Sequence, residues 1–370
     1  MKKIMNQKLH FTESFIILFA LMVVTAGCKK NDMTPLSMNA QNQEDASVSL
    51  NGFQQVNLVA NTSGFGAQHV NPRLLNAWGM SADDEGEIWV SAADAGFSFV
   101  YDKTGAHEMP PVTIPSHQSN VRGAPTGNIY NETKNFVIPG TGEPAEFIFA
   151  SEDGTISAWN SGSSAVVVAD RSGHDASYKG IAIANDGGAN FLYATNFTKA
   201  KIDVFDKKFN YVTGKHFNDP NLPAGYAPFN IRNMHGMLFV TYALQTADGE
   251  EDSTGPGLGF VNIFKPDGSL VKRFASHGTL NAPWGIAETR PGFLGDHKVI
   301  LIGNFGDGRI NVFDLNGNFM GQLRNNANPV VIDGLWAIDN NIPGTNAKHL
   351  YFTAGPNDEE DGLFGFLLKK

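Results

Sequence analysis

The stretch Asn281-Ala282-Pro283-Trp284-Gly285-Ile286-Ala287 contains a short phrase that returns six times along this chain of 370 residues. Clear copies are Asn76-Ala77-Trp78-Gly79-Met80 and Ser177-Tyr178-Lys179-Gly180-Ile181, and weaker ones lie at 124–128, 227–231 and 333–337. Aligned on Gly79, Gly127, Gly180, Asn230, Gly285 and Trp336, the copies are 48, 53, 50, 55 and 51 residues apart. A unit of about 50 residues with several short strands is typical of a propeller blade. The spacing therefore predicts an all-β, six-bladed β-propeller.

The fifth repeat shows how one blade is built. Apolar or alternating runs predict strands at 284–287, 299–302, 309–314 and 319–323, separated by turns rich in Gly, Asn and Asp. Inner strands crowd around the axis of a propeller, which favours glycine at the fourth position of the phrase. Asn230 and Trp336 depart from this rule and are expected to narrow the channel. A β-sandwich is the competing fold, but it would not explain six nearly equal spacings.

The last repeat indicates how the ring closes. It contains strands predicted at 350–353 and 363–368, and the sequence then ends without a fourth strand. The segment 53–59 (FQQVNLV) precedes the first repeat and has no blade of its own. We expect this segment to supply the missing outer strand of the sixth blade, which would remove an open sheet edge.

The first residues have the pattern of an export signal. Lysines at positions 2, 3 and 8 precede an apolar run at 15–24, which is too short to span a bilayer as a stable helix. Thr25-Ala26-Gly27-Cys28 resembles the lipobox of bacterial lipoproteins, which implies a signal peptide at 1–27 and an acylated Cys28. The alternative is an ordinary secretory signal. We expect a flexible tether at 28–52 and a propeller at 53–370.

The propeller region also resembles known proteins. Asn57-Leu58-Val59-Ala60-Asn61, the run 71–79 and the run 281–287 are similar to an uncharacterised bacterial family of secreted, NHL-like six-bladed propellers. The resemblance implies the fold and an export route, but no activity. With the lipobox-like residues, and with Lys29 after the cysteine, it implies a bacterial lipoprotein of the outer membrane or cell surface.

Composition excludes several classes of function. The formal net charge is −10 at pH 7 and basic residues do not cluster, which argues against nucleic-acid binding. The lone cysteine excludes an internal disulfide framework. The sequence has no phosphate-binding glycine loop, no zinc-ligand spacing and no Gly-x-Ser-x-Gly elbow. We expect a monomer that is attached to a membrane only through its lipid.

Oxygen-bearing side chains are predicted at one mouth of the channel. Loops that enter first strands and loops that leave second strands meet on the same face of a propeller. Those positions hold Glu152, Asn196, Asn304 and Asp333. Oxygen donors of this kind suit Ca²⁺, and calcium-dependent lactonases are similar in the type and place of such residues. The alternative is that these side chains cap turns and bind backbone amides.

Other candidates on this face are weaker. His174, which is followed by Asp175, is a candidate general base, although surface histidines are usually without such a role. Trp78, Trp284 and Trp336 are predicted near the mouth, where they could stack on a ligand or simply pack the core. Two acidic loops, at 246–259 and 355–362, could recruit a cation or a basic partner, or could be solvated loops.

These observations favour a lipid-anchored envelope propeller that binds a ligand or a protein through its mouth. The alternative is a calcium-dependent hydrolase of the lactonase or phosphotriesterase type, in which a cation polarises a carbonyl or phosphoryl oxygen. A third interpretation is a purely structural component of the envelope. The sequence does not name a substrate.

Overall fold

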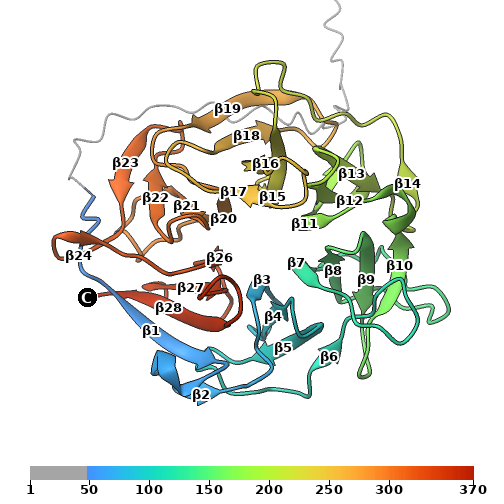
Figure 1. Ribbon diagram of the computed structural model, residues 1–370, viewed down its shortest axis with the longest axis horizontal. Coiled ribbons are helices and arrows are strands. Elements are labelled where there is room, and N and C mark those ends of the chain that lie inside the picture. The colour runs from blue at the N-terminus through green and yellow to red at the C-terminus, as the bar shows by residue number, and fades with distance from the viewer. Residues whose placement is uncertain (1–47) are drawn as a thin grey trace, which may run out of the picture. The chain divides into compact units, whose positions relative to one another are not determined.

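Six antiparallel sheets surround a central channel in the computed structural model, which describes residues 48–370 (Figure 1). The first blade contains β3 (Ala77–Ala82), β4 (Ile88–Ala92), β5 (Phe97–Tyr101) and β6 (Val112–Thr113). The second contains β7 (Pro125–Tyr130), β8 (Phe147–Ser151), β9 (Thr155–Trp159) and β10 (Val166–Asp170). The third contains β11 (Tyr178–Asp186), β12 (Ala189–Asn196), β13 (Lys201–Phe205) and β14 (Tyr211–Val212). The prediction of an all-β, six-bladed propeller is confirmed.

The remaining blades follow the same plan with small additions. The fourth contains β15 (Tyr226–Met234), β16 (Met237–Gln245), β18 (Phe260–Phe264) and β19 (Leu270–Ser276), and the short β17 (Asp252–Ser253) pairs with β16. The fifth contains β20 (Pro283–Glu288), β21 (Ile300–Asn304), β22 (Ile310–Phe313) and β23 (Phe319–Gln322). The sixth contains β26 (Leu335–Asp339), β27 (His349–Ala354) and β28 (Leu363–Lys369). A small hairpin of β24 (Arg324–Asn325) and β25 (Asn328–Pro329) joins the last two blades.

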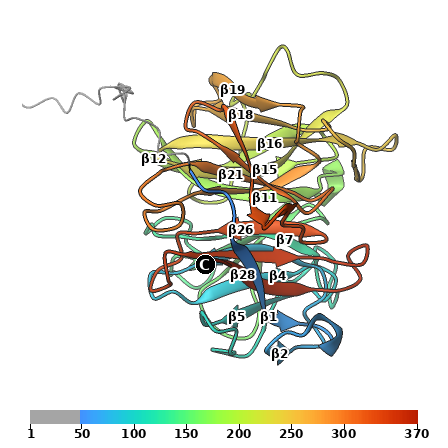
Figure 2. The same cartoon turned by 90° about the vertical axis from the view of Figure 1, so that its left-hand side faces the viewer.

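The leading strand closes the ring, as predicted. β1 (Phe53–Ala60) pairs antiparallel with β28, and the register runs from Phe53 opposite Lys369 to Ala60 opposite Leu363. The two strands lie side by side in both views (Figures 1 and 2), and β2 (His69–Val70) extends the same sheet. The packed chain starts slightly earlier than position 53, because the Arg324 amide donates to the Leu50 carbonyl at 2.8 Å.

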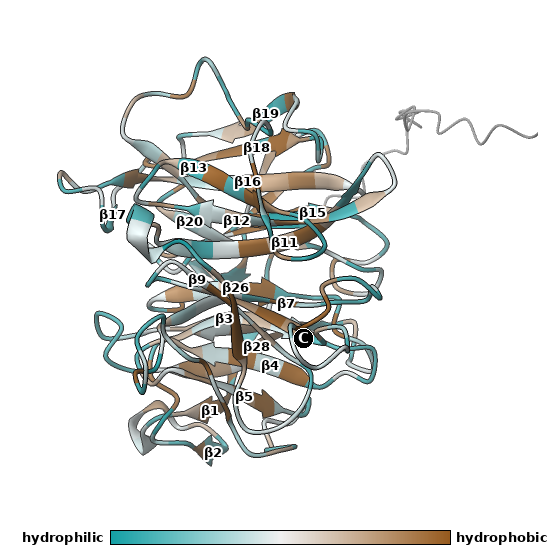
Figure 3. Cartoon of the chain, turned by 90° about the vertical axis from the view of Figure 1, so that its right-hand side faces the viewer, coloured by the Kyte–Doolittle hydropathy of each residue, from teal (hydrophilic) through white to brown (hydrophobic). Residues whose placement is uncertain are grey.

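Hydrophobic side chains fill the spaces between blades. Figure 3 shows apolar residues concentrated along the strands and polar residues mainly in the connecting loops. Between the first two blades, the Trp89 ring stacks on the Phe147 ring with centroids 4.1 Å apart, and Trp159 packs against Trp89. Burial of such large rings is the main stabilising contribution to this contact. These rings therefore pack the interface between the first two blades.

Each first strand carries a bulge at the repeated phrase. In all six blades the pairing between the first and second strands shifts by one residue within the phrase. A bulge of this kind redirects the side chain at which it occurs. The register also corrects one expectation. Leu335 pairs with Ala354 as Ala77 pairs with Ala92, so Trp336 occupies the third position of the phrase, and Ala337 takes the place of the glycine.

The fourth position is small because neighbouring first strands touch there. A Cβ atom on Gly79 would collide with the Thr126 carbonyl oxygen and would lie 2.8 Å from the Gly127 Cα. Gly285 is similarly confined, with the Trp336 carbonyl oxygen 2.8 Å from the position of a Cβ. The expected reason for glycine at this position therefore holds.

The predicted signal peptide, the lipidation site at Cys28 and most of the predicted tether lie outside the described residues. Among the helices in the part of the chain that is described, none has the length and apolar character needed to cross a membrane.

Candidate functional site

The side chains at the third position of the phrase gather at the axis. They are Trp78, Thr126, Lys179, Phe229, Trp284 and Trp336, one from each blade, and all are buried. The Trp78 and Trp336 rings stack with centroids 3.8 Å apart, and Phe305 stacks on the other side of Trp336 at 4.0 Å. Trp284 meets the edges of Trp78 and Trp336 at 6.4 and 5.9 Å. These rings form an aromatic plug in the channel, below the mouth.

The three tryptophans predicted to stack on a ligand all belong to this plug. Trp78, Trp284 and Trp336 are only 2, 4 and 1% exposed. The Trp336 indole donates to Asn76 Oδ1 at 2.9 Å, whereas the indole N–H groups of Trp78 and Trp284 have no acceptor among residues 48–370. Ligand stacking on these rings stays a prediction, and such a ligand would have to displace one of the present ring neighbours.

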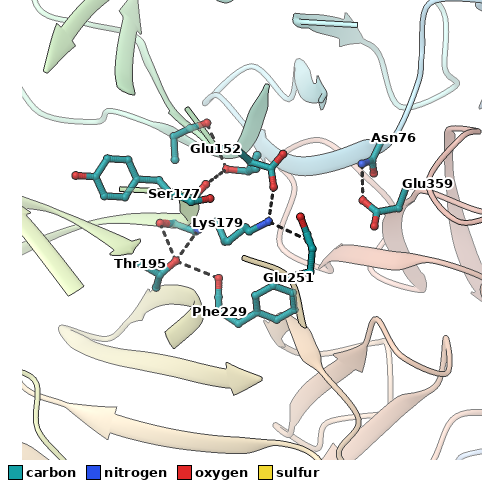
Figure 4. A network of polar contacts seen from close by, with 12 residues as sticks. Asn76, Glu152, Ser177, Lys179, Thr195, Phe229, Glu251 and Glu359 are labelled. Atoms are coloured by element: carbon teal, nitrogen blue, oxygen red, sulfur yellow. Dashed lines mark hydrogen bonds and ion pairs between the residues drawn. The ribbon is translucent and has the colours of Figure 1, made fainter. Parts of the chain in front are cut away.

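Lys179 introduces a charge into the otherwise apolar plug. Its side chain is 2% exposed, and its ammonium lies 5.0 Å from the Trp78 ring centroid and 5.9 Å from that of Phe197. Figure 4 shows Lys179 between two carboxylates: Glu152 accepts a hydrogen bond from it, and Glu251 lies 3.7 Å away. Burial opposes the charge on Lys179, but Glu152 and Glu251 outweigh this effect and raise its pKa. These two carboxylates therefore stabilise the charged form of Lys179.

Further carboxyl groups surround Lys179 on the mouth side. Burial raises the pKa of Glu359 to about 7, although Asn76 Nδ2 donates to its Oε2 at 2.6 Å, and Glu152 adds to the rise. Burial also raises the pKa of Asp252 to about 6, and its Oδ2 atom is buried without a hydrogen-bond donor in the described chain. The pKa of Asp94 is raised by burial and by Glu152, against its hydrogen bond from Asn76.

Negative charge therefore exceeds positive charge at this mouth. Asp94, Glu152, Glu251, Asp252 and Glu359 come from the first, second, fourth and sixth blades. Lys179 is the cation that the structure places among them. Burial raises the pKa of Asp252 to about 6 and that of Glu359 to about 7, so both values lie close to neutral pH. Such a site can attract a cation or hold a transferable proton.

The residues predicted to bind calcium are on the expected face, but each has its own partners. Glu152 pairs with Lys179, and Asp333 accepts from the Asn357 amide at 3.0 Å. Asn196 donates to Asp203 at 2.8 Å, and Asn304 donates to Asp307 at 2.9 Å. Residues 48–370 contain no group of three or more His, Cys, Asp or Glu side chains placed to hold a metal ion. Calcium binding by these four residues stays a prediction.

His174 lies on an exposed turn at η2 (Ser172–His174), ahead of β11. The carboxylate next to it in sequence, Asp175, contacts Lys199 instead, with 3.1 Å between Nζ and Oδ2. The structure therefore does not pair this imidazole with the aspartate that was expected to orient it. A role for His174 as a general base stays a prediction.

The sequence predicted the face on which the site lies better than it predicted the residues that form the site. The acidic loops at 246–259 and 355–362 were recognised, and they supply Glu251, Asp252 and Glu359. Lys179 was not singled out. A signal was present, because Lys179 holds the third position in one of the clearest copies of the phrase, where four of the other five blades have Trp or Phe.

Comparison with known proteins defines a family without a known activity. No protein-family model matches the chain. It is 34% identical over 318 residues to an uncharacterised protein of Acanthamoeba polyphaga mimivirus, covering 82% of this chain and 77% of the viral one. This chain belongs to the family of that protein. The prediction of a bacterial family is corrected here, because the relatives found are proteins of this virus.

Solved structures of low sequence similarity share the fold. A Bacteroides thetaiotaomicron protein of unknown function aligns with a TM-score of 0.51 at 11% identity, covering 80% of this chain and 70% of that one. A streptogramin B lyase aligns with a TM-score of 0.50 at 12% identity, covering 85% and 97%. At such identities the likeness shows the propeller fold alone.

Proposed function

We propose that the chain is a binding module whose mouth accepts an organic cation, such as the ammonium group of an amine. The observation that supports this function is the set of carboxyl groups near the Lys179 ammonium. They are Glu152, Glu251, Asp252 and Glu359, and Asp94 lies near Glu152. Burial, with a smaller contribution from Glu152 and Glu251, raises the pKa of Glu359 to about 7, and an added cation would stabilise the charged form of this carboxyl group. The affinity would come from charge and should weaken with salt.

The arrangement favours an organic cation over a compact metal ion. A metal ion needs several oxygen atoms at nearly equal short distances from one point. Here Glu152 is held by Lys179, and Glu359 is held by Asn76. An alkylammonium group needs only one or two of these acceptors, and its apolar part could contact loop residues at the rim.

Calorimetric titration with 1,4-diaminobutane at low ionic strength tests this function. Glu359→Gln keeps the acceptor for Asn76 but removes a negative charge, so it should weaken binding about fivefold to tenfold. Glu360→Gln is the matched control, because Glu360 is the exposed neighbour in the same loop. Equal affinity of both variants, or no heat of binding to the unmodified protein, would contradict the proposal.

Titration with CaCl₂ tests the calcium-dependent hydrolase as the alternative. If Glu152, Asn196, Asn304 and Asp333 bind Ca²⁺, the ion should raise the melting temperature after chelation, and Asp333→Asn should abolish that rise. Asp333 is chosen because its carboxylate contacts a backbone amide rather than Lys179. An unchanged melting temperature in saturating calcium would remove the basis for this alternative.

We also propose that Cys28 carries a lipid and that the protein is exported to the cell envelope. The support is the run Thr25-Ala26-Gly27-Cys28 after an apolar stretch. Cys28→Ala should move the protein from the membrane fraction to the soluble fraction of a bacterial expression host. An unchanged membrane fraction would contradict lipidation at this residue.

A further inference from the structure

A cavity of about 300 Å³ lies in the channel at the end opposite the mouth. It is lined by the ends of the first strands and by the turns that follow them, and all six blades contribute. Trp284 of the aromatic plug is one of the lining residues. The plug therefore separates this cavity from the acidic mouth, and the two ends of the channel can bind different molecules. A volume of this size is at the lower end of small-molecule sites.

Arg232 brings a cation with unused hydrogen-bond donors into the cavity. It extends from β15, and its side chain is 30% exposed. The guanidinium makes three hydrogen bonds: to the carbonyls of Ile286 at 2.8 Å and Ile338 at 3.2 Å, and to Asp339 at 2.6 Å. A guanidinium has five N–H groups, so two of them have no acceptor in the described chain. These donors are available to an oxygen atom of a ligand.

The inner end of the cavity has apolar walls. Ile181, Ile286 and Ile338 line the cavity. Trp284 also lines this end, and its ring belongs to the aromatic plug, where it meets the edges of Trp78 and Trp336. Apolar walls of this kind suit the hydrocarbon part of a ligand.

The opposite wall offers acceptors. Asp83 and Asp84 line the cavity from the first blade, which lies across the ring from the fourth blade and Arg232 (Figure 1). Asp84 receives a hydrogen bond from Tyr130 at 3.3 Å. Asp83 Oδ1 accepts from the amides of Glu85 and Glu87, which leaves its other oxygen free in the described structure. A simple anion would be repelled by these carboxylates, and a simple amine would leave the free Arg232 donors unused.

We propose that this cavity binds an amphoteric molecule, in which an apolar chain separates a carboxylate from an ammonium. The carboxylate would accept from the free N–H groups of Arg232, as guanidinium groups commonly bind carboxylates. The ammonium would lie toward Asp83 and Asp84, and the chain would contact the isoleucine walls. This site is independent of the function proposed for the mouth, which lies beyond the plug.

Three probes of similar length distinguish the contribution of the carboxylate from that of the ammonium. They are 6-aminohexanoate, hexanoate and hexylamine. Titration calorimetry should show 6-aminohexanoate binding about tenfold more tightly than either of the others. Each titration is repeated with the Glu359→Gln variant. Amine binding at the mouth should weaken in this variant, whereas binding in the cavity should not change. Equal binding of hexylamine and 6-aminohexanoate, or no binding at about 10 mM, would overturn the proposal.

Two variants then test the two walls. Arg232→Gln should weaken 6-aminohexanoate about tenfold and abolish any binding of hexanoate. Asp84→Asn should weaken 6-aminohexanoate about threefold without affecting hexanoate, and since Asp84 is exposed it keeps the proposal testable if Arg232→Gln folds poorly. Arg324→Gln, on the distant β24, removes the same charge and should change nothing. An unchanged affinity in Asp84→Asn, or an equal loss in Arg324→Gln, would overturn the proposal.

Discussion

The two ends of the channel differ although the same six strands build both. At the mouth, an aromatic plug closes the axis, and Lys179 is buried among carboxyl groups. At the opposite end, Arg232 lines an open cavity, and a part of its guanidinium is unused. Both cations sit on first strands, Lys179 at the third position of the phrase and Arg232 after the glycine position. The position along the strand therefore decides whether a cation is enclosed or available to a ligand.

The largest effect should come from opening the ring on which both ends depend. Deletion of 53–60 removes β1 and exposes the edge of β28, so we expect no soluble, cooperatively folding protein. The Lys370 amide donates to the Gly52 carbonyl at 3.1 Å, so a short turn can join these positions. Moving 53–60 behind Lys370 through such a turn should restore folding. A deletion variant with an unchanged melting curve would contradict closure by β1.

Removing each cation in turn compares the two ends directly. Lys179→Met removes a buried cation and leaves the carboxylates of Glu152 and Glu251 without their partner, so it should lower the free energy of unfolding by about 3 kcal/mol. Arg232→Met should cost only about half of that, roughly 1.5 kcal/mol, because water in the open cavity can bind the freed carbonyls. Urea denaturation measures both values. Equal losses would mean that the two environments do not differ as described.

The close packing of neighbouring first strands supports both ends of the channel, and it can be tested at the glycine position of the phrase. Gly79→Ala places a methyl group against the Thr126 carbonyl and should destabilise the fold by about 2 kcal/mol. Gly173→Ala is the matched control, because no atom lies within 4 Å of a Cβ at that position. Thermal unfolding of the two variants gives the comparison. Equal melting temperatures would show that neighbouring first strands can move apart.

The smallest expected effect is a pH dependence confined to the mouth. The pKa of Glu359 is raised from 4.5 to about 7 by folding, so the folded state holds a proton that the unfolded chain has released between these values. The stability of the fold should therefore decrease as the pH rises through that window, by about 3 °C in melting temperature. In Glu359→Gln this slope should flatten. Arg232→Met should leave this pH dependence unchanged, because Glu359 lies at the mouth and Arg232 at the opposite end of the channel.

Binding of a cation at the mouth should show the opposite trend with pH. As the pH falls below 7, Glu359 and then Asp252 become protonated, and the mouth loses negative charge. The affinity for 1,4-diaminobutane should therefore decrease between pH 8 and pH 5.5, beyond any change seen in Glu359→Gln. An affinity that rises over this range would contradict a carboxylate site.

The fold could be predicted because each repeat carries the same local information. Turn residues and alternating strands recur in each blade, and glycine holds the fourth position in four of the six. A leading strand without a blade and a last blade without a fourth strand together indicate closure. Only the sixth copy was misaligned, since Trp336 was matched to the glycine position. The pairing of Leu335 with Ala354 shows that the true alignment of this copy differs from the predicted one by a single residue. A bulge shifts the pairing of two strands by one residue, and a weak copy of the repeated phrase gives no sign of this shift.

The amino-acid sequence by itself determined the number of blades, the closing strand and the acidic loops of one face. Only the tertiary structure decided which side chains of those loops turn inward: Glu251, Asp252 and Glu359 approach Lys179, while Asn196 and Asn304 bond within their own blades. The reason is that strand patterns depend on neighbours along the chain. A site at the axis depends on contacts between blades, whose residues lie far apart in sequence and are oriented by bulges and loop packing.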